Sequence, residues 1–311
     1  MAKNSFKLNS HPVIVITDSG LGGLSVLADL EQLISHSNLF DEVRLVYFNS
    51  HAQHGHGYNS MRETSRKAEV FNNALSSMID KFSPDLILIA CNTLSIVYPL
   101  TETAQNSKVQ IMGIAEFAVK MFYGKLAAEP DSKIILYGTP TTINSDEYKN
   151  KLIEAGIDSG RIINQPCYLL ETEIQNNPSG ARTEQMINNF TLQAKSMIDS
   201  PVKDDTKFYA GFCCTHYGYS KAIFDKVLSE HFGNYEILNP NFMMSKKVAS
   251  KGKKGKGKTK IKIEVYSRVN ISSEEINSIG KLIEDKAPLS YRALVNYHLD
   301  PNLFVFYREQ E

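Results

Sequence analysis

LILIACNTLS, residues 86–95, gives the strongest indication of the fold. Its apolar run has the length of one β-strand. A continuous apolar run is typical of a strand that is buried on both faces, as in a parallel sheet. Cys91 ends the run, and small polar residues follow before a helical pattern begins. A second stretch, FYAGFCCTHYG at 208–218, repeats this order and has Cys214 in the matching place. The sequence therefore predicts two strand ends of the same kind.

Short apolar runs alternate with helical patterns along most of the chain. The expected strands are 12–17, 43–48, 85–90, 109–114, 133–138, 207–212, 235–238 and 261–269. A capped helix is expected after Ser272 or Ser273. Alternating strands and helices form βαβ units with parallel sheets. We therefore predict an α/β fold, and 311 residues leave room for two such sheets.

The composition is that of an ordinary folded protein, with 42% apolar and 22% charged residues. Lys plus Arg equals Asp plus Glu at 34 each, so no global charge favours nucleic acid or a membrane as partner. The first twelve residues lack the apolar core of a signal peptide, and no apolar run approaches the roughly 20 residues of a membrane span. Four cysteines do not suggest a disulfide framework. We expect a cytoplasmic protein with reduced thiols.

One segment, 245–264, is a Lys/Gly tract that breaks the pattern. Glycine lowers order and like charges repel, so we expect a solvated, flexible loop at 245–260. The alternative is an anion or nucleic-acid contact, but no aromatic residue is interleaved. A polar, Tyr-rich C-terminal extension follows the last expected helix.

Both cysteines stand where open α/β sheets bind ligands, at the carboxyl ends of strands. The N-terminus of a following helix binds carboxylates and lowers the pKa of a thiol. A free cysteine is often only a small buried apolar residue. Two cysteines in matching settings favour a chemical role, whereas Cys167 and Cys213 lack that symmetry and are expected to be structural.

Two further motifs are less specific. A strand ending at Asp18 runs into a Gly-rich turn, which fits either a phosphate cradle or a tight turn, and no P-loop Gly-Lys-Ser/Thr follows. HAQHGHGY at 51–58 holds three histidines, which fit a metal site or a polar loop at a pocket mouth. No acidic or thiol ligand is near in sequence, so we favour the loop and predict no metal.

Three motifs in order produce a family resemblance. They are Asp18-Ser19-Gly20 with Gly22-Gly23, then Cys91-Asn92-Thr93, then Cys214-Thr215-His216-Tyr217. The chain resembles glutamate racemases of the aspartate/glutamate racemase superfamily from about residue 12 to about 240. The stretch GTPTTINSDEY at 138–148 is similar to the family's entry into its second domain.

The resemblance implies two similar α/β lobes with the active site in the cleft between them. Residues 1–115 plus 219–311 would form the first lobe and 116–218 the second. It implies an amino-acid substrate, no cofactor and often a homodimer. The mechanism would be two-base, with Cys91 acting on the D-enantiomer and Cys214 on the L-enantiomer.

The resemblance also assigns further site residues. Asp18 would assist Cys91, and His216 would assist Cys214. The substrate would be held by Ser19, His56, Gly57, Asn92, Thr93, Thr142 and Thr215. A family glutamate that supports the histidine has two candidates here, Glu173 and Gln175, and the sequence does not choose between them.

One departure bears on the substrate. The family's Pro-Tyr-Gly is replaced by Gly55-His56-Gly57, where His56 would bind a side-chain carboxylate or simply widen the pocket. The first hypothesis is a glutamate racemase that supplies D-glutamate for peptidoglycan and cell shape. The second is a racemase of aspartate or another amino acid. The third is a homologue that binds an amino acid or a partner protein without turnover.

Overall fold

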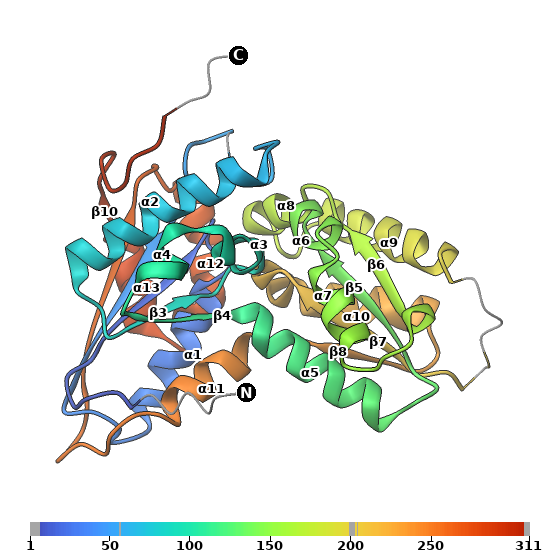
Figure 1. The fold of residues 1–311 in the computed structure, drawn as a ribbon, viewed down its shortest axis with the longest axis horizontal. Helices are drawn as coiled ribbons and strands as arrows, with labels where there is room; N and C mark the ends of the chain where they lie inside the picture. Colours follow the sequence, from blue (N-terminus) through green and yellow to red (C-terminus); the bar gives the residue numbers. More distant parts are fainter. Residues whose placement is uncertain (1–6, 56, 199–202, 204, 308–311) are drawn as a thin grey trace. The chain divides into compact units, whose positions relative to one another are not determined.

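The computed structural model describes residues 7–55, 57–198, 203 and 205–307, and it divides the chain into two compact units (Figure 1). Unit 1 consists of Met1–Gly113 and Asn241–Glu311, and unit 2 of Ile114–Pro240. Unit 2 is therefore an insertion between two segments of unit 1. In both units every strand pair among the described residues is parallel, so the predicted α/β class with parallel sheets is confirmed.

Unit 1 is built on a six-stranded sheet in the order β10-β9-β2-β1-β3-β4. Its strands are β1 (Val13–Asp18), β2 (Glu42–Asn49), β3 (Leu86–Ile89), β4 (Gln110–Gly113), β9 (Lys260–Ser267) and β10 (His298–Leu299). Its helices are α1 (Leu24–Ser35), α2 (Thr64–Phe82), α3 (Asn92–Val97), the 3-10 turn η1 (Tyr98–Leu100), α4 (Glu102–Asn106), α11 (Asn241–Ala249), α12 (Ser273–Glu284) and α13 (Pro288–Val295).

Two groups of helices cover this sheet. Successive side chains of a strand point to opposite faces, so each buried strand serves both groups. Val15, Val46 and Ile87 pack with the apolar face of α2, whose contacts include α3 and α4. Helices α1, α11, α12 and α13 pack against one another as the second group. The long apolar runs of the sequence are thus explained by burial on both faces.

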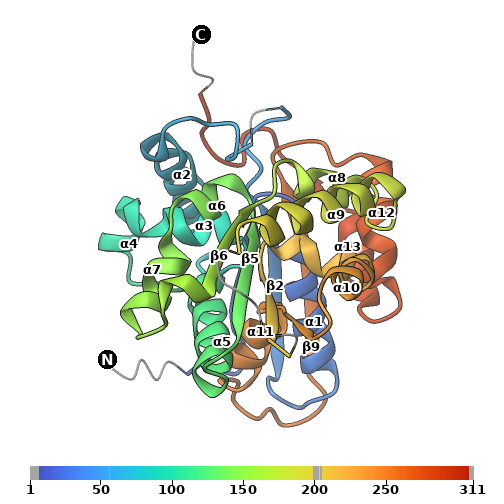
Figure 2. The same cartoon turned by 90° about the vertical axis from the view of Figure 1, so that its right-hand side faces the viewer.

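Unit 2 has a four-stranded sheet in the order β6-β5-β7-β8. Its strands are β5 (Lys133–Gly138), β6 (Ile162–Pro166), β7 (Phe208–Cys213) and β8 (Tyr235–Leu238). Its helices are α5 (Ile114–Ala128), α6 (Pro140–Asn144), α7 (Glu147–Glu154), η2 (Ser159–Arg161), α8 (Leu170–Asn176), α9 (Ala181–Ser196), η3 (Thr215–Ser220) and α10 (Lys221–His231). Helices α5 and α9 lie on opposite sides of β5 and β6 (Figures 1 and 2).

The structure corrects three sequence predictions. The boundary expected at 218/219 lies at 240/241, because β8 pairs with β7 and so belongs to the second sheet. Strand β6 was not predicted, since IINQP is short and half polar. Part of the Lys/Gly tract is helical: 245–249 form the end of α11, where Met244 and Val248 are buried within unit 1.

Candidate active site

The first group of candidate residues surrounds Cys91, directly after β3 in unit 1. Cys91 is the N-cap of α3, and its side chain is 5% exposed. The backbone N–H of Leu94 donates to Cys91 Sγ at 3.5 Å, and the hydroxyl of Ser19 lies 3.2 Å from the same sulfur. The thiol therefore has two donor groups that would stabilise a thiolate.

Burial nevertheless dominates the acidity of this thiol. It raises the pKa of Cys91 to about 12, and the negative charge of Asp18 adds to the rise. The hydrogen bonds from Ser19 and Leu94 lower the pKa but do not outweigh burial. Cys91 is therefore a protonated thiol at neutral pH, and in this state it can act as an acid but not as a base.

Asp18 acts on this thiol because β1 and β3 are neighbouring strands and Gly23 packs tightly against both of their ends. A Cβ added at Gly23 would lie 2.9 Å from Asp18 Cβ and 3.0 Å from Ala90 Cβ, so only glycine fits there. The backbone N–H of Gly20 donates to Asp18 Oδ1 at 3.2 Å. The Gly-rich turn thus lets a buried carboxylate sit beside the end of β3.

The second group surrounds Cys214, directly after β7 in unit 2. Cys214 is 7% exposed and is followed by the 3-10 helix η3, on which His216 is 5% exposed. Cys214 Sγ lies 3.8 Å from His216 Nδ1. His216 Nε2 lies 3.0 Å from the side-chain oxygen of Gln175, which α8 supplies. The thiol, imidazole and amide form one chain of hydrogen-bonding groups.

The chain of contacts fixes the state of the imidazole. Burial lowers the pKa of His216 to about 4, so it is neutral at pH 7. An amide oxygen only accepts, so Nε2 carries the hydrogen and Nδ1 presents a lone pair to the Cys214 thiol. The choice left open by the sequence falls on Gln175, since Glu173 pairs instead with Arg182 at 3.2 Å.

The remaining candidates divide between the units. Unit 1 holds Asn92, Thr93 and Gly57, and unit 2 holds Thr142 and Thr215. The four polar side chains are each at most 3% exposed, and all follow the carboxyl end of a strand. His56 lies outside the described residues.

Comparison with known proteins shows what the chain is similar to in sequence. No family model matches the chain. A glutamate racemase from Aquifex pyrophilus is 27% identical over 233 residues, which are 75% of this chain and 80% of that protein. One from Helicobacter pylori (strain G27) is 32% identical over 146 residues, so the chain spans about half of its length.

Solved structures extend the likeness to the fold. The glutamate racemase structure from Aquifex pyrophilus has a TM-score of 0.60 at 23% identity and covers 89% of this chain and 95% of that one. The structure from Francisella tularensis in complex with D-glutamate has a TM-score of 0.66 at 18% identity, with coverage of 89% and 95%. In sequence and in fold, this chain is similar to glutamate racemases.

The histidine segment after β2 is part of the Cys91 surroundings. His51 Nδ1 lies 3.0 Å from the carbonyl oxygen of Ser19, the residue that contacts the Cys91 thiol. The sequence pointed to the histidines of this segment but not to this contact, which depends on β1 and β2 being neighbours. Among the described residues, no group of three or more His, Cys, Asp and Glu side chains could hold a metal ion.

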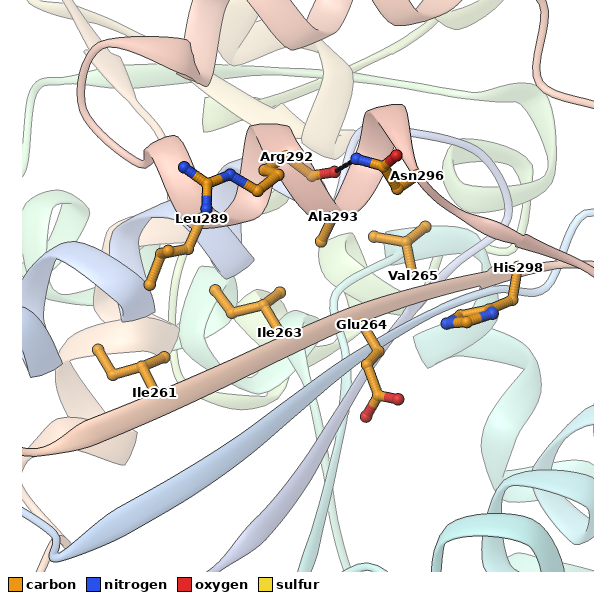
Figure 3. A pocket seen from close by; sticks show the side chains of 9 residues that line it. All are labelled: Ile261, Ile263, Glu264, Val265, Leu289, Arg292, Ala293, Asn296 and His298. Atoms are coloured by element: carbon orange, nitrogen blue, oxygen red, sulfur yellow. Dashed lines mark hydrogen bonds between the residues drawn. The ribbon is translucent and has the colours of Figure 1, made fainter.

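A separate cavity lies elsewhere in unit 1. Its volume is about 260 Å³, and it lies between β9 and α13 (Figure 3). The lining residues are Ile261, Ile263, Glu264, Val265, Leu289, Arg292, Ala293, Asn296 and His298, which include none of the candidate site residues. None of the described helices is long and apolar enough to cross a membrane.

Proposed function

We propose that this chain interconverts L- and D-glutamate by a two-base mechanism, with Cys91 and Cys214 as the acid and base. The observation that carries the proposal is the pair of buried thiols, each at the carboxyl end of a parallel strand, with His216 beside Cys214 and the charge of Asp18 acting on Cys91. The names of its relatives supply the substrate class. D-glutamate for peptidoglycan would be the product, made in the cytoplasm.

The first chemical step is removal of the α-proton. An amino-acid α-proton is a very weak acid, so the base must be formed and held close. In the L-to-D direction, Cys214 passes its proton to Nδ1 of neutral His216 and attacks as the thiolate. Gln175 holds Nε2 and stabilises the imidazolium that results.

The second step returns a proton to the opposite face. Cys91 is the donor in this direction, and its raised pKa keeps it protonated until the carbanion forms. Asp18 serves the reverse direction, in which Cys91 must lose its proton. The α-ammonium group of a bound substrate would lower the pKa of the buried thiol by its positive charge. Each direction thus uses one thiolate and one thiol.

The substrate must be held as negative charge builds on its α-carboxylate. Small hydroxyl and amide side chains are suited to this task because they donate hydrogen bonds without adding charge. Asn92 and Thr93 would act from unit 1, with Ser19 and the backbone near Gly57. Thr142 and Thr215 would act from unit 2. His56 is part of the proposal as a substrate contact, and a homodimer is the proposed assembly.

A second candidate keeps the chemistry but changes the substrate to aspartate or another amino acid. Its motive is the Gly55-His56-Gly57 segment, where the family has Pro-Tyr-Gly. Gly55 has a φ of 74°, a left-handed conformation that Pro could not adopt, so the backbone itself differs from the family pattern. A third candidate is binding without turnover, against which both intact thiol groups argue.

One assay separates the three candidates. The protein is incubated in D2O with L- and D-glutamate, then with L- and D-aspartate, and deuterium at Cα and optical rotation are followed. Exchange and loss of rotation with glutamate are expected. Exchange with aspartate alone would favour the second candidate, and no exchange with any amino acid would favour the third.

A further inference from the structure

The ring of His51 connects the segment after β2 to the surroundings of Cys91 by a hydrogen bond to Ser19. A carbonyl oxygen only accepts, so the hydrogen of the His51–Ser19 bond lies on Nδ1 of His51. The side chain of the same Ser19 meets Cys91 Sγ at 3.2 Å. His51 therefore holds the main chain of the residue whose hydroxyl stabilises the Cys91 thiolate.

The ring itself is well held. The backbone N–H of His51 donates to Asn49 Oδ1 at 3.0 Å, and its ring centroid lies 5.8 Å from that of His54. A Cβ at Gly57 would lie 3.6 Å from Cε1 of His51, so the following turn closes over the ring. Burial lowers the pKa of His51, with His54 and Glu275 as the charged groups that act on it. The ring is neutral at pH 7.

Residues after β9 hold the segment from the other side. Arg268 Nε donates to the carbonyl of Ala52 at 3.0 Å, and its guanidinium also donates to the carbonyl of Phe304 in the C-terminal extension. His54 Nε2 donates to the carbonyl of Asn270 at 2.9 Å. The C-terminal extension thus reaches the neighbourhood of Cys91 through Arg268.

We propose that His51 is a positioning residue for Cys91, acting through Ser19, and that Arg268 keeps the His51 segment in place. This inference rests on the proposed function for its catalytic meaning, but its structural part concerns the Cys91 thiol alone. A histidine is well suited here, because its rigid ring reaches from one strand end to the next with a donor at a fixed place.

The test compares His51→Leu, which removes the donor, with His51→Asn, whose amide can replace it. The matched control is His36→Leu, because exposed His36 makes the same kind of ring contact, Nδ1 to the carbonyl of Gln32 at 2.7 Å. The first readout is the pH profile of Cys91 alkylation by iodoacetamide, followed by peptide mass spectrometry. It needs no turnover, so it stays informative if the racemase assignment fails.

In His51→Leu the Ser19 hydroxyl should no longer be held against Cys91 Sγ. Loss of its hydrogen bond to the thiolate should reduce Cys91 alkylation at a given pH about tenfold. His51→Asn should recover most of the loss, and His36→Leu should match the unaltered chain. Arg268→Gln should give a smaller loss in the same direction. An unchanged Cys91 profile in His51→Leu would overturn the proposal.

A double-mutant cycle tests the route through Ser19. In a Ser19→Ala background the hydroxyl is absent, so His51→Leu should have almost no further effect on Cys91 alkylation or on kcat. An undiminished effect in that background would show that His51 acts elsewhere and would overturn the proposal. Should His51→Leu fail to fold, His51→Phe, which keeps a planar ring but has no donor, gives the same comparison.

Discussion

The two cysteine settings share their topology but differ in their chemistry. Cys91 has a carboxylate partner and donors from Ser19 and Leu94, and burial raises its pKa to about 12. Cys214 has a neutral imidazole whose lone pair can receive its proton. The proton acceptor beside Cys214 is uncharged, whereas the carboxylate that acts on Cys91 is negatively charged. Equal placement at strand ends therefore does not imply equal surroundings for the two thiols.

The most severe way to test this comparison is to remove each thiol. Cys91→Ser and Cys214→Ser should each lower racemisation at least about 10³-fold, because a serine hydroxyl is far too weak an acid or base. Racemisation is measured by polarimetry from both enantiomers. Cys91→Ser should still exchange the α-proton of L-glutamate in D2O, and Cys214→Ser that of D-glutamate. Near-normal racemisation by either variant would refute the two-base assignment.

Removing the partners should reveal the asymmetry. His216→Asn and Asp18→Asn should each lower kcat/KM about 10²-fold for both enantiomers alike, since the two enantiomers have equal free energy. Exchange of the α-proton for deuterium without inversion at Cα does not have to be equal for the two enantiomers. It should fall mostly for L-glutamate in His216→Asn and mostly for D-glutamate in Asp18→Asn. The reverse pattern would exchange the roles of the two partners.

The buried imidazole should also affect stability against pH. The pKa of His216 is about 4 in the folded chain, against an ordinary value of 6.5, so the unfolded chain binds more protons between these pH values. The stabilising contribution is complete above pH 6.5 and is lost as the pH falls to 4, by about 3 kcal/mol in order of magnitude.

Urea unfolding at a series of pH values measures this loss. His216→Gln, which does not titrate, should show a flatter dependence over the same pH window. The matched control is His231→Gln. His231 is the last residue of α10 in the same unit, and its Nε2 lies 2.7 Å from Asn188 Oδ1. A pH dependence that is the same with and without His216 would contradict the neutral state assigned to the ring.

The smallest expected effect separates the two candidates on α8. Gln175→Leu removes the acceptor of His216 and should lower kcat about tenfold, as loss of one hydrogen bond to a charged group implies. Glu173→Gln only breaks a contact with Arg182, whose side chain is 76% exposed, and should leave kcat unchanged. Steady-state kinetics on both variants distinguish them, and a larger effect from Glu173→Gln would reverse the assignment.

The sequence was most informative where one strand carries its own signal. Cys91 and Cys214 were placed at strand ends because the apolar runs before them are unmistakable, and both placements are confirmed. The partner of His216 was not readable in the same way. Positions two apart on a helix point about 200° apart, so choosing Gln175 over Glu173 requires the helix's orientation. The contact of His51 with Ser19 likewise depends on which strands are neighbours.

The boundary error has a similar cause. The return to unit 1 was expected directly after the second cysteine motif, but β8 is one more strand of the second sheet. A short strand such as YEIL has no sequence feature that says which sheet it joins. Pairing is a long-range property, and local patterns do not encode it.

The insertion of unit 2 within unit 1 has a consequence for synthesis. Strand β2 pairs with β9 along its whole length, and the ion pair of Arg44 with Glu264 joins residues 220 positions apart. A ribosome makes all of unit 2 before it makes β9. Unit 2 can therefore fold while the sheet of unit 1 still lacks β9 and β10 next to β2. Nascent unit 1 would then expose the edge of β2, a surface prone to wrong pairing. The vulnerable interval for this chain therefore runs from the synthesis of β2 to the synthesis of β9.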